Sequence, residues 1–190
     1  MKSKESQANY IKKYRLKMRI LSMLQRNNNC LFLTFTFRNS VLKNTSQETR
    51  KRYIKAYLND MAKEYILNID FGNENKREHY HAIATPKYEI FLYDIYNKKY
   101  GFVKGEPIGQ LKRFTNINKS IYDIAERLTN HATKETTQNF KIIYSRPNKA
   151  LKESKYKNEI ETRLYKIQAE KEHKRILKEM ESYINEIYIN

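Results

Sequence analysis

The sequence predicts an α+β domain: an antiparallel sheet with flanking helices, preceded by a basic helix and followed by a long helix. Two observations support this prediction. Segments in which apolar and polar side chains alternate, as in a strand, are interleaved with segments in which apolar side chains recur at helical spacing. A chain of 190 residues also has the length of one domain with an appendage. We expect a basic helix over residues 1–29, the α+β domain over 30–147 and a helical extension over 148–190.

The N-terminal segment is basic and amphipathic. From Met1 to Asn29 there are eight Lys and Arg side chains against one acidic residue, Glu5. An apolar stripe at near-helical spacing predicts a helix over residues 8–27; it consists of Tyr10, Tyr14, Met18, Ile20, Leu21 and Leu24. Such a helix packs through its stripe, contacts a polyanion through its charges, or does both.

A strand, a helix and a hairpin follow. In residues 30–39 an apolar set alternates with a mixed one, which predicts a strand inside the sheet; the apolar set is Leu31, Leu33, Phe35 and Phe37. The next helix begins with Thr45 and Glu48 in capping-box spacing, and its apolar periodicity extends to Tyr65. Residues 65–85 predict a hairpin that ends at Pro86.

The remaining elements are predicted more simply. We expect a short strand over residues 100–103, a second helix over 117–136 and a last strand over 139–146. From about residue 151 the chain has a helical pattern to its end. The heptad spacing of this last helix slips between residues 167 and 173, which favours packing on the domain or a partner over a long coiled coil.

Composition restricts the function classes. The 38 Lys and Arg against 21 Asp and Glu give a net charge of +17, which favours a nucleic-acid partner. Cys30 is the only cysteine, so an internal disulfide and a cysteine-based zinc cluster are excluded. No apolar run is long enough to span a bilayer, and the N-terminus lacks a signal-peptide core. We therefore expect a cytoplasmic protein without a membrane partner.

Two of the four histidines lie one residue apart, in the stretch "REHYHAIA". Because side chains alternate along a strand, His79 and His81 point to the same face, about 6 to 7 Å apart, and Tyr80 to the other. This geometry suits one metal ion. The alternative is a pair of exposed or hydrogen-bonded histidines without a ligand role.

Three motifs together resemble those of the HUH endonucleases and rolling-circle replication initiators, in particular short proteins of Gram-positive plasmids and phages. They are "FLTFTF", "EHYHAIA" and the helix end "NHATK", and the resemblance covers roughly residues 30–146. It implies an HUH-type, RRM-like antiparallel sheet. It also implies that His79 and His81 hold a divalent ion, Mn²⁺ or Mg²⁺ or else Zn²⁺, which polarises a scissile phosphate. Asp70 is the first candidate for a third ligand and Glu78 the second.

The sequence departs from the family at the nucleophile. Family members carry Tyr-x-x-Lys on the later helix, whereas this chain has His131 and Lys134. Tyr122 lies nine residues earlier, about 13 Å along a helix, and Tyr144 stays open as an alternative. Lys134 is expected at the phosphate. The residues expected to contact nucleic acid are Lys12, Lys13, Arg15, Arg127, Lys141 and Arg146.

Three explanations for His131 follow. In the first it acts as a base, for example on the 2′-hydroxyl of RNA, and in the second it joins the histidine pair as a metal ligand. In the third the protein has lost catalysis. The first two predict a metal-dependent nuclease of a mobile genetic element that acts on RNA or single-stranded DNA. The third predicts a silent RNA- or DNA-binding protein that inhibits a host protein or nucleoprotein complex, as in an anti-defence or anti-CRISPR role.

Overall fold

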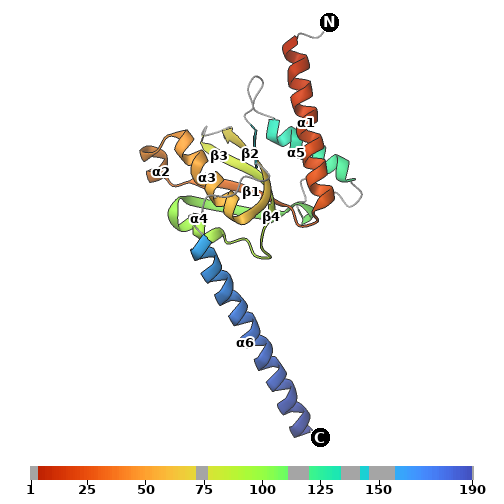
Figure 1. Cartoon of the computed structure of the whole chain (residues 1–190), viewed down its shortest axis with the longest axis vertical. Coiled ribbons are helices and arrows are strands. Elements are labelled where there is room, and N and C mark those ends of the chain that lie inside the picture. The colour runs from red at the N-terminus through yellow and green to blue at the C-terminus, as the bar shows by residue number, and fades with distance from the viewer. Residues whose placement is uncertain (1–3, 72–76, 111–119, 134–141, 146–156, 190) are drawn as a thin grey trace. The chain divides into compact units, whose positions relative to one another are not determined.

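The computed structural model describes residues 4–71, 77–110, 120–133, 142–145 and 157–189. The chain divides into two compact units, residues 1–150 and 151–190. The first unit contains a five-stranded antiparallel sheet with helices on both faces (Figure 1). The second contains one long helix, α6 (Lys157–Ile189). The predicted α+β class, with a helix at each end, is confirmed.

The sheet has the strand order β4-β1-β3-β2-β5, so the His-x-His strand β3 is at its centre. All strand pairs that the structure describes are antiparallel. The elements of the first unit are α1 (Lys4–Arg26), β1 (Leu31–Phe37), α2 (Asn39–Asn44), α3 (Gln47–Met61), β2 (Ala62–Phe71), β3 (Glu78–Pro86), α4 (Tyr93–Lys99), β4 (Gly101–Pro107), the 3₁₀ turn η1 (Ile108–Gln110), α5 (Ile121–Thr133) and β5 (Ile143–Tyr144).

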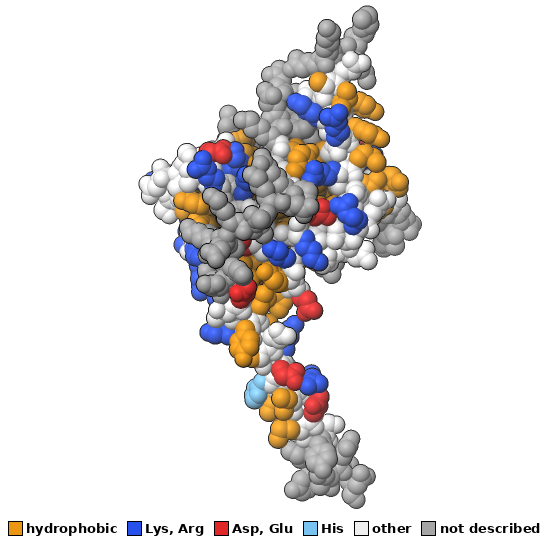
Figure 2. Space-filling view, viewed as in Figure 1, with side chains coloured by type: hydrophobic (Ala, Val, Ile, Leu, Met, Phe, Trp, Pro, Cys, Tyr) orange, Lys and Arg blue, Asp and Glu red, His pale blue; other side chains and the backbone are white. Residues whose placement is uncertain are grey.

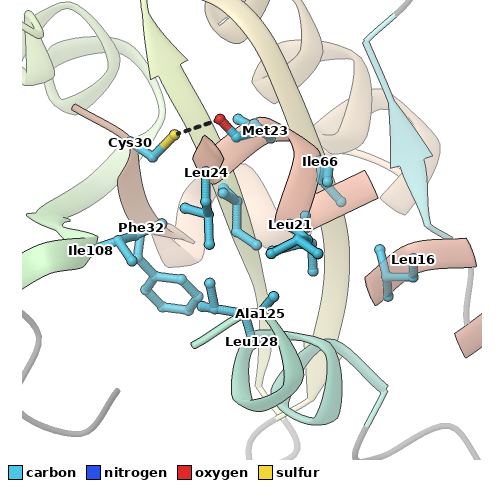
Figure 3. Packing of buried hydrophobic residues seen from close by; sticks show 12 residues of the cluster. Leu16, Leu21, Met23, Leu24, Cys30, Phe32, Ile66, Ile108, Ala125 and Leu128 are labelled. Atoms are coloured by element: carbon cyan, nitrogen blue, oxygen red, sulfur yellow. Dashed lines mark hydrogen bonds between the residues drawn. The ribbon is translucent and has the colours of Figure 1, made fainter. Parts of the chain in front are cut away.

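Helices α1 and α5 pack side by side on one face of the sheet (Figure 1). The second half of α1 has its apolar residues at helical spacing, and they meet Ala125 and Leu128 of α5 (Figure 3). Both helices cover the strand residues Phe32, Ile66 and Ile83. Each fully buried aliphatic or aromatic side chain of such a core contributes about 1.5–3 kcal/mol. This core fixes α5 over one end of the central strands.

Helices α3 and α4 cover the opposite face. Tyr57 of α3 and Tyr96 of α4 pack edge-on against Phe35 of β1. The Tyr57 hydroxyl donates a hydrogen bond to the Leu92 carbonyl at 2.8 Å, which satisfies its polar group in the core. Burial raises the pKa of both tyrosines well above the ordinary value, so both stay neutral.

Some local predictions are corrected. Helix α3 has Ser46 as its N-cap, because the Ser46 side chain accepts from the backbone N–H of Thr49; the predicted cap was Thr45, which instead bonds back to Val41. The helix ends at Met61, and Tyr65 lies in β2. Helices α2 and α4 were not predicted, since both are too short to show a clear apolar period.

The predicted stripe on α1 is divided between two environments. Ile20, Leu21 and Leu24 are buried as expected. Tyr10 and Tyr14 are instead 67% and 55% exposed, because they precede the part of α1 that packs on the sheet. The described residues contain no helix that is both long and apolar enough to cross a membrane.

Candidate metal centre

The strand register brings together a polar patch on the face that α1 and α5 cover. In antiparallel strands, directly opposite residues share a face and lie about 4.5–5.5 Å apart. Two such rows cross the strands β1, β3 and β2: Thr34, His81 and Asn68 in one, and Thr36, His79 and Asp70 in the other. The next row, Phe32, Ile83 and Ile66, belongs to the apolar core.

Asp70, His79 and His81 form a compact group whose potential ligand atoms all lie within 4.8 Å of one another. Asp70 Oδ2 is 3.0 Å from Nε2 of His79 and 3.2 Å from Nε2 of His81. The three side chains are 14%, 21% and 8% exposed. Two imidazole nitrogens and one carboxylate oxygen, converging in a partly dry site, can hold a divalent metal ion.

The second nitrogen of each imidazole also has a partner. His79 Nδ1 lies 3.1 Å from the Arg77 carbonyl and Nε2 lies 3.0 Å from Asp70 Oδ2, and both of these oxygens only accept. In the tautomer that leaves Nε2 free for a metal ion, Nδ1 carries the proton and donates it to the Arg77 carbonyl. His81 Nδ1 lies 3.1 Å from the Thr34 hydroxyl, which can donate or accept. Such outer partners fix ring orientation in metal sites, and here they present both Nε2 atoms to the same point.

His81 is held in its neutral form. Burial is the main cause, followed by repulsion from His131 and His79, and together they lower its pKa to about 3 despite the neighbouring Asp70. A neutral imidazole is the form that binds metal. The site therefore does not have to displace a proton from His81 in the neutral range.

This shift predicts a pH dependence of stability in the metal-free protein. The unfolded chain protonates His81 near its ordinary pKa of 6.5 and the folded one only near 3. The free energy of unfolding is therefore highest above pH 6.5. Between pH 6.5 and pH 3 it falls by about 1.4 kcal/mol per pH unit. Chemical denaturation in EDTA at about pH 7 and about pH 5 measures a loss of about 2 kcal/mol. In His81→Gln the loss of unfolding free energy between these two pH values should be smaller by about 2 kcal/mol. A loss equal to that of the wild type would contradict the attribution of this pH dependence to His81.

His131 of α5 lies directly beside the group. Its ring centroid is 4.7 Å from that of His81 and 5.5 Å from that of Phe32. It is not a member of the group whose ligand atoms lie within 4.8 Å, which favours a neighbouring role over that of a third nitrogen ligand. Arg127 is half-buried one turn earlier on α5, on the same side of the helix as His131.

The two tyrosines considered as nucleophiles lie away from the centre. Tyr122 is 55% exposed, nine residues before His131 on α5. Tyr144 pairs with Ile66, four residues and about 13 Å along β2 from Asp70. Its ring lies under the Arg19 guanidinium at 4.3 Å, and burial raises its pKa. Neither tyrosine therefore lies beside the group of Asp70, His79 and His81.

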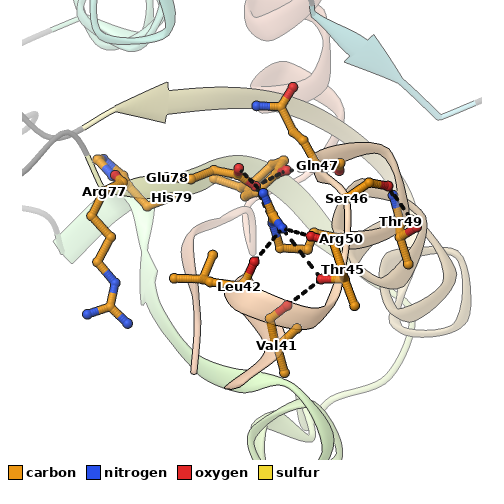
Figure 4. Close-up of polar contacts among 11 residues, drawn as sticks. Val41, Leu42, Thr45, Ser46, Gln47, Thr49, Arg50, Arg77, Glu78 and His79 are labelled. Atoms are coloured by element: carbon orange, nitrogen blue, oxygen red, sulfur yellow. Dashed lines mark hydrogen bonds and ion pairs between the residues drawn. The ribbon is translucent and has the colours of Figure 1, made fainter. Parts of the chain in front are cut away.

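Glu78, the second candidate ligand, lies on the opposite face of β3. Arg50 Nε and Nη2 donate to its two carboxylate oxygens at 2.9 and 2.6 Å (Figure 4), and the Tyr80 hydroxyl also donates to it at 2.5 Å. Burial alone would raise the pKa of Glu78, but these hydrogen bonds outweigh burial, and the pKa lies below its ordinary value. Glu78 therefore fastens α3 to β3 and leaves Asp70 as the carboxylate of the metal group.

Removing Arg50 should destabilise the fold. In Arg50→Met the Glu78 carboxylate stays buried without its cation, and breaking such a pair costs about 3–5 kcal/mol. Thermal or urea denaturation measures the loss, with the exposed Arg52→Met as the matched control. The double variant Arg50→Met with Glu78→Leu should recover part of it, and a double variant no more stable than Arg50→Met would contradict this explanation.

The same register adds two residues from the edge strand β4. Lys104 lies opposite Thr34 and Phe102 opposite Thr36, so both share the face of the histidine pair. Phe102 is 55% exposed, and the Lys104 side chain is 65% exposed. Thr34, Asn68 and Lys104 were not predicted as site residues. The only signal for them is their strand register, which a single sequence does not specify.

The predicted nucleic-acid contacts are only partly described. Lys12, Lys13 and Arg15 are exposed on α1, as a surface contact requires. Lys134, Lys141 and Arg146 lie outside the described residues.

Comparison with known proteins adds no identity. No protein-family model matches the chain, and neither the curated proteins nor the solved structures contain a match.

Proposed function

We propose that this protein is a divalent-metal-dependent phosphodiesterase that acts on nucleic acid, with the HUH-type centre to which its motifs are similar. The observation that carries the proposal is the convergence of Asp70, His79 and His81 within 4.8 Å, with the His131 ring against His81. Imidazole and carboxylate ligands together suit Zn²⁺ or Mn²⁺ better than Mg²⁺, which prefers an all-oxygen shell. An ion bound there would polarise a phosphate oxygen.

The proton transfer that cleavage needs would come from a side chain of this protein. With a histidine in place of the tyrosine, His131 would accept the proton of the 2′-hydroxyl of RNA. The 2′-oxygen then bonds to the adjacent phosphorus and the bond to the 5′-oxygen breaks. The products are a 2′,3′-cyclic phosphate and a 5′-hydroxyl that has taken up a proton. This route needs no covalent adduct with the protein.

Nucleic acid is the proposed substrate because of charge and exposed side chains. The chain carries +17, Lys12, Lys13 and Arg15 are exposed, and Phe102 and Lys104 flank the centre on the same face. An exposed aromatic ring suits base stacking, and Lys104, which pairs with Glu106 on the surface, can exchange that partner for a phosphate. The test is incubation of end-labelled RNA and DNA of one sequence with Mn²⁺ or with EDTA. Metal-dependent cleavage of RNA supports the proposal.

A second candidate is a nucleic-acid-binding protein without cleavage activity, acting on a host nucleoprotein complex. The observation that favours it is the burial of His131 Nε2, which has less than 1 Å² of exposed surface, so a substrate would have to displace its neighbours to reach it. Tight binding of RNA and DNA without cleavage, in Mn²⁺ and in Zn²⁺, would support this candidate over the first.

Binding should be strongly salt-dependent in either case. Each phosphate contact on a single strand contributes a log–log slope of about −0.7, because counterions are released. Replacing Lys12, Lys13 and Arg15 together with glutamine should flatten the slope by about two units, measured by fluorescence anisotropy between low and moderate salt. The matched control replaces the exposed Lys171, Lys174 and Lys178 of α6. An unchanged slope in the α1 variant would assign that helix to another role.

A further inference from the structure

Helix α1 presents an apolar stripe to the solvent along residues 10–18. Tyr10 and Tyr14 are 67% and 55% exposed, and Ile11 and Met18 continue the stripe at 46% and 43%. Figure 2 shows hydrophobic side chains beside Lys and Arg side chains over this helix. An exposed stripe of this kind, bordered by polar groups, marks an interaction surface.

The two tyrosines also form one side of a groove. Tyr10, Lys13, Tyr14 and Lys17 of α1 face Glu126, Thr129 and Asn130 of α5 across a cavity of about 250 Å³. This volume is below the roughly 300–1,000 Å³ of pockets that enclose a small molecule. The groove is therefore too small to enclose a whole drug-sized molecule, and it suits single flat rings that lie against its wall. The tyrosines are one helical turn apart, about 6 Å along the axis, so each can receive one such group.

An ion pair bridges the two walls of the groove, and one further lysine borders it. Lys17 Nζ bonds to Glu126 Oε2 at 2.8 Å, which ties α1 to α5 at the wall. Arg19 lies over Tyr144 and Arg26 pairs with Glu64, so these two cations are engaged elsewhere. Lys13 lines the groove beside the tyrosines and is exposed. Lys12 and Arg15 are also exposed but lie on the other side of α1. Flat groups carried on a polyanion complement this arrangement.

We infer that the groove between α1 and α5 is a binding site for unpaired nucleotides, in which bases stack on Tyr10 and Tyr14 and a phosphate pairs with Lys13. Stacking needs the face of a base, which a duplex keeps inside its own stack, so the site selects single-stranded segments. The inference rests on the proposed function for its choice of nucleic acid. Asn130 lines the groove and His131 follows it at the centre, so α5 connects the two sites.

The test measures affinity without catalysis. Labelled single-stranded RNA and DNA of mixed sequence, and the corresponding duplexes, are titrated in EDTA with the full-length protein and followed by fluorescence anisotropy. The double variant Tyr10→Ala with Tyr14→Ala should bind single strands at least about tenfold more weakly, and duplexes with little change. Tyr10→Phe with Tyr14→Phe keeps the rings and should stay within about twofold of wild type. Tyr165→Ala, which removes a 76% exposed tyrosine of α6, is the matched control.

Four outcomes would overturn the inference. They are equal affinity of the alanine variant and the wild type for single strands, an equal loss for duplexes, an equal loss in the phenylalanine variant, and a wild type that binds no nucleic acid at low salt but binds anionic vesicles through the same tyrosines. Failure of the proposed function is distinguished by cleavage. A protein that loses affinity with the alanine pair but never cleaves RNA keeps the stacking site and lacks the phosphodiesterase.

Discussion

Replacing His131 with alanine is expected to abolish metal-dependent cleavage of RNA, with a rate loss of about 10²–10⁴-fold. The reason is that His131 is the only described titratable side chain of α5 whose ring lies against His81 of the metal group. Denaturing gels of end-labelled RNA measure the rate. Phosphorylation of the new 5′ end by a kinase should identify it as a hydroxyl, as the 2′-hydroxyl route requires.

The controls for this prediction distinguish the three candidate nucleophiles, which are the 2′-hydroxyl of RNA, Tyr122 and Tyr144. His173→Ala removes the exposed histidine of α6 and should cleave at the wild-type rate, as should Tyr144→Phe and Tyr122→Phe. DNA of the same sequence should stay intact, and no label should remain attached to the protein. A labelled protein band from the DNA reaction, lost in either phenylalanine variant, would contradict the account and restore the tyrosine mechanism.

The second large effect concerns metal binding. His79→Ala and His81→Ala should each weaken Mn²⁺ or Zn²⁺ binding by more than the roughly 10–100-fold typical of a lost outer partner, because each removes a direct ligand. Isothermal titration calorimetry measures the affinity. His79 is only partly buried, with its side chain 21% exposed, and it belongs to no apolar stripe, so its loss should leave the circular dichroism spectrum unchanged. His81 stacks on Phe32, so its variant should also lose some stability.

Two further variants provide reference values for the expected loss of metal affinity. Thr34→Val removes only the hydroxyl that meets His81 Nδ1 and should cost about 10–100-fold in affinity. His173→Ala should bind as the wild type does. If both His79→Ala and His81→Ala bound metal as tightly as the wild type, the histidine pair would be a hydrogen-bonded structural feature. Asp70 would then serve only as its hydrogen-bond acceptor.

The pairing of Asp70 with His79 was predictable from the sequence for a simple physical reason. A short hairpin has its register set by its apolar pattern and turn, so the residues of "YILNIDFG" and "EHYHAIA" could be aligned from the sequence, and Asp70 does lie opposite His79. The face of β1 was also predictable, since Phe35 and Phe37 are apolar and Thr34 and Thr36 are not.

What the sequence could not supply was long-range register. Thr34 meets His81 across 47 residues of chain, and Lys104 joins the same row from β4; pairings at such separation leave no local pattern. The role of Glu78 was missed for a related reason, because its partner Arg50 is on a helix 28 residues away. The exposure of Tyr10 and Tyr14 was missed because helical periodicity shows that a face is apolar and does not show what covers it.

The most direct test of the metal centre is a crystal structure of the protein with Zn²⁺ or Mn²⁺, with anomalous diffraction recorded at the edge of that metal. The account predicts one anomalous peak, about 2.0–2.2 Å from Nε2 of His79, Nε2 of His81 and a carboxylate oxygen of Asp70, with His79 Nδ1 still bonded to the Arg77 carbonyl. Strong density elsewhere, or none, with both Nε2 atoms still bonded to Asp70 at about the distances of a hydrogen bond, would contradict it.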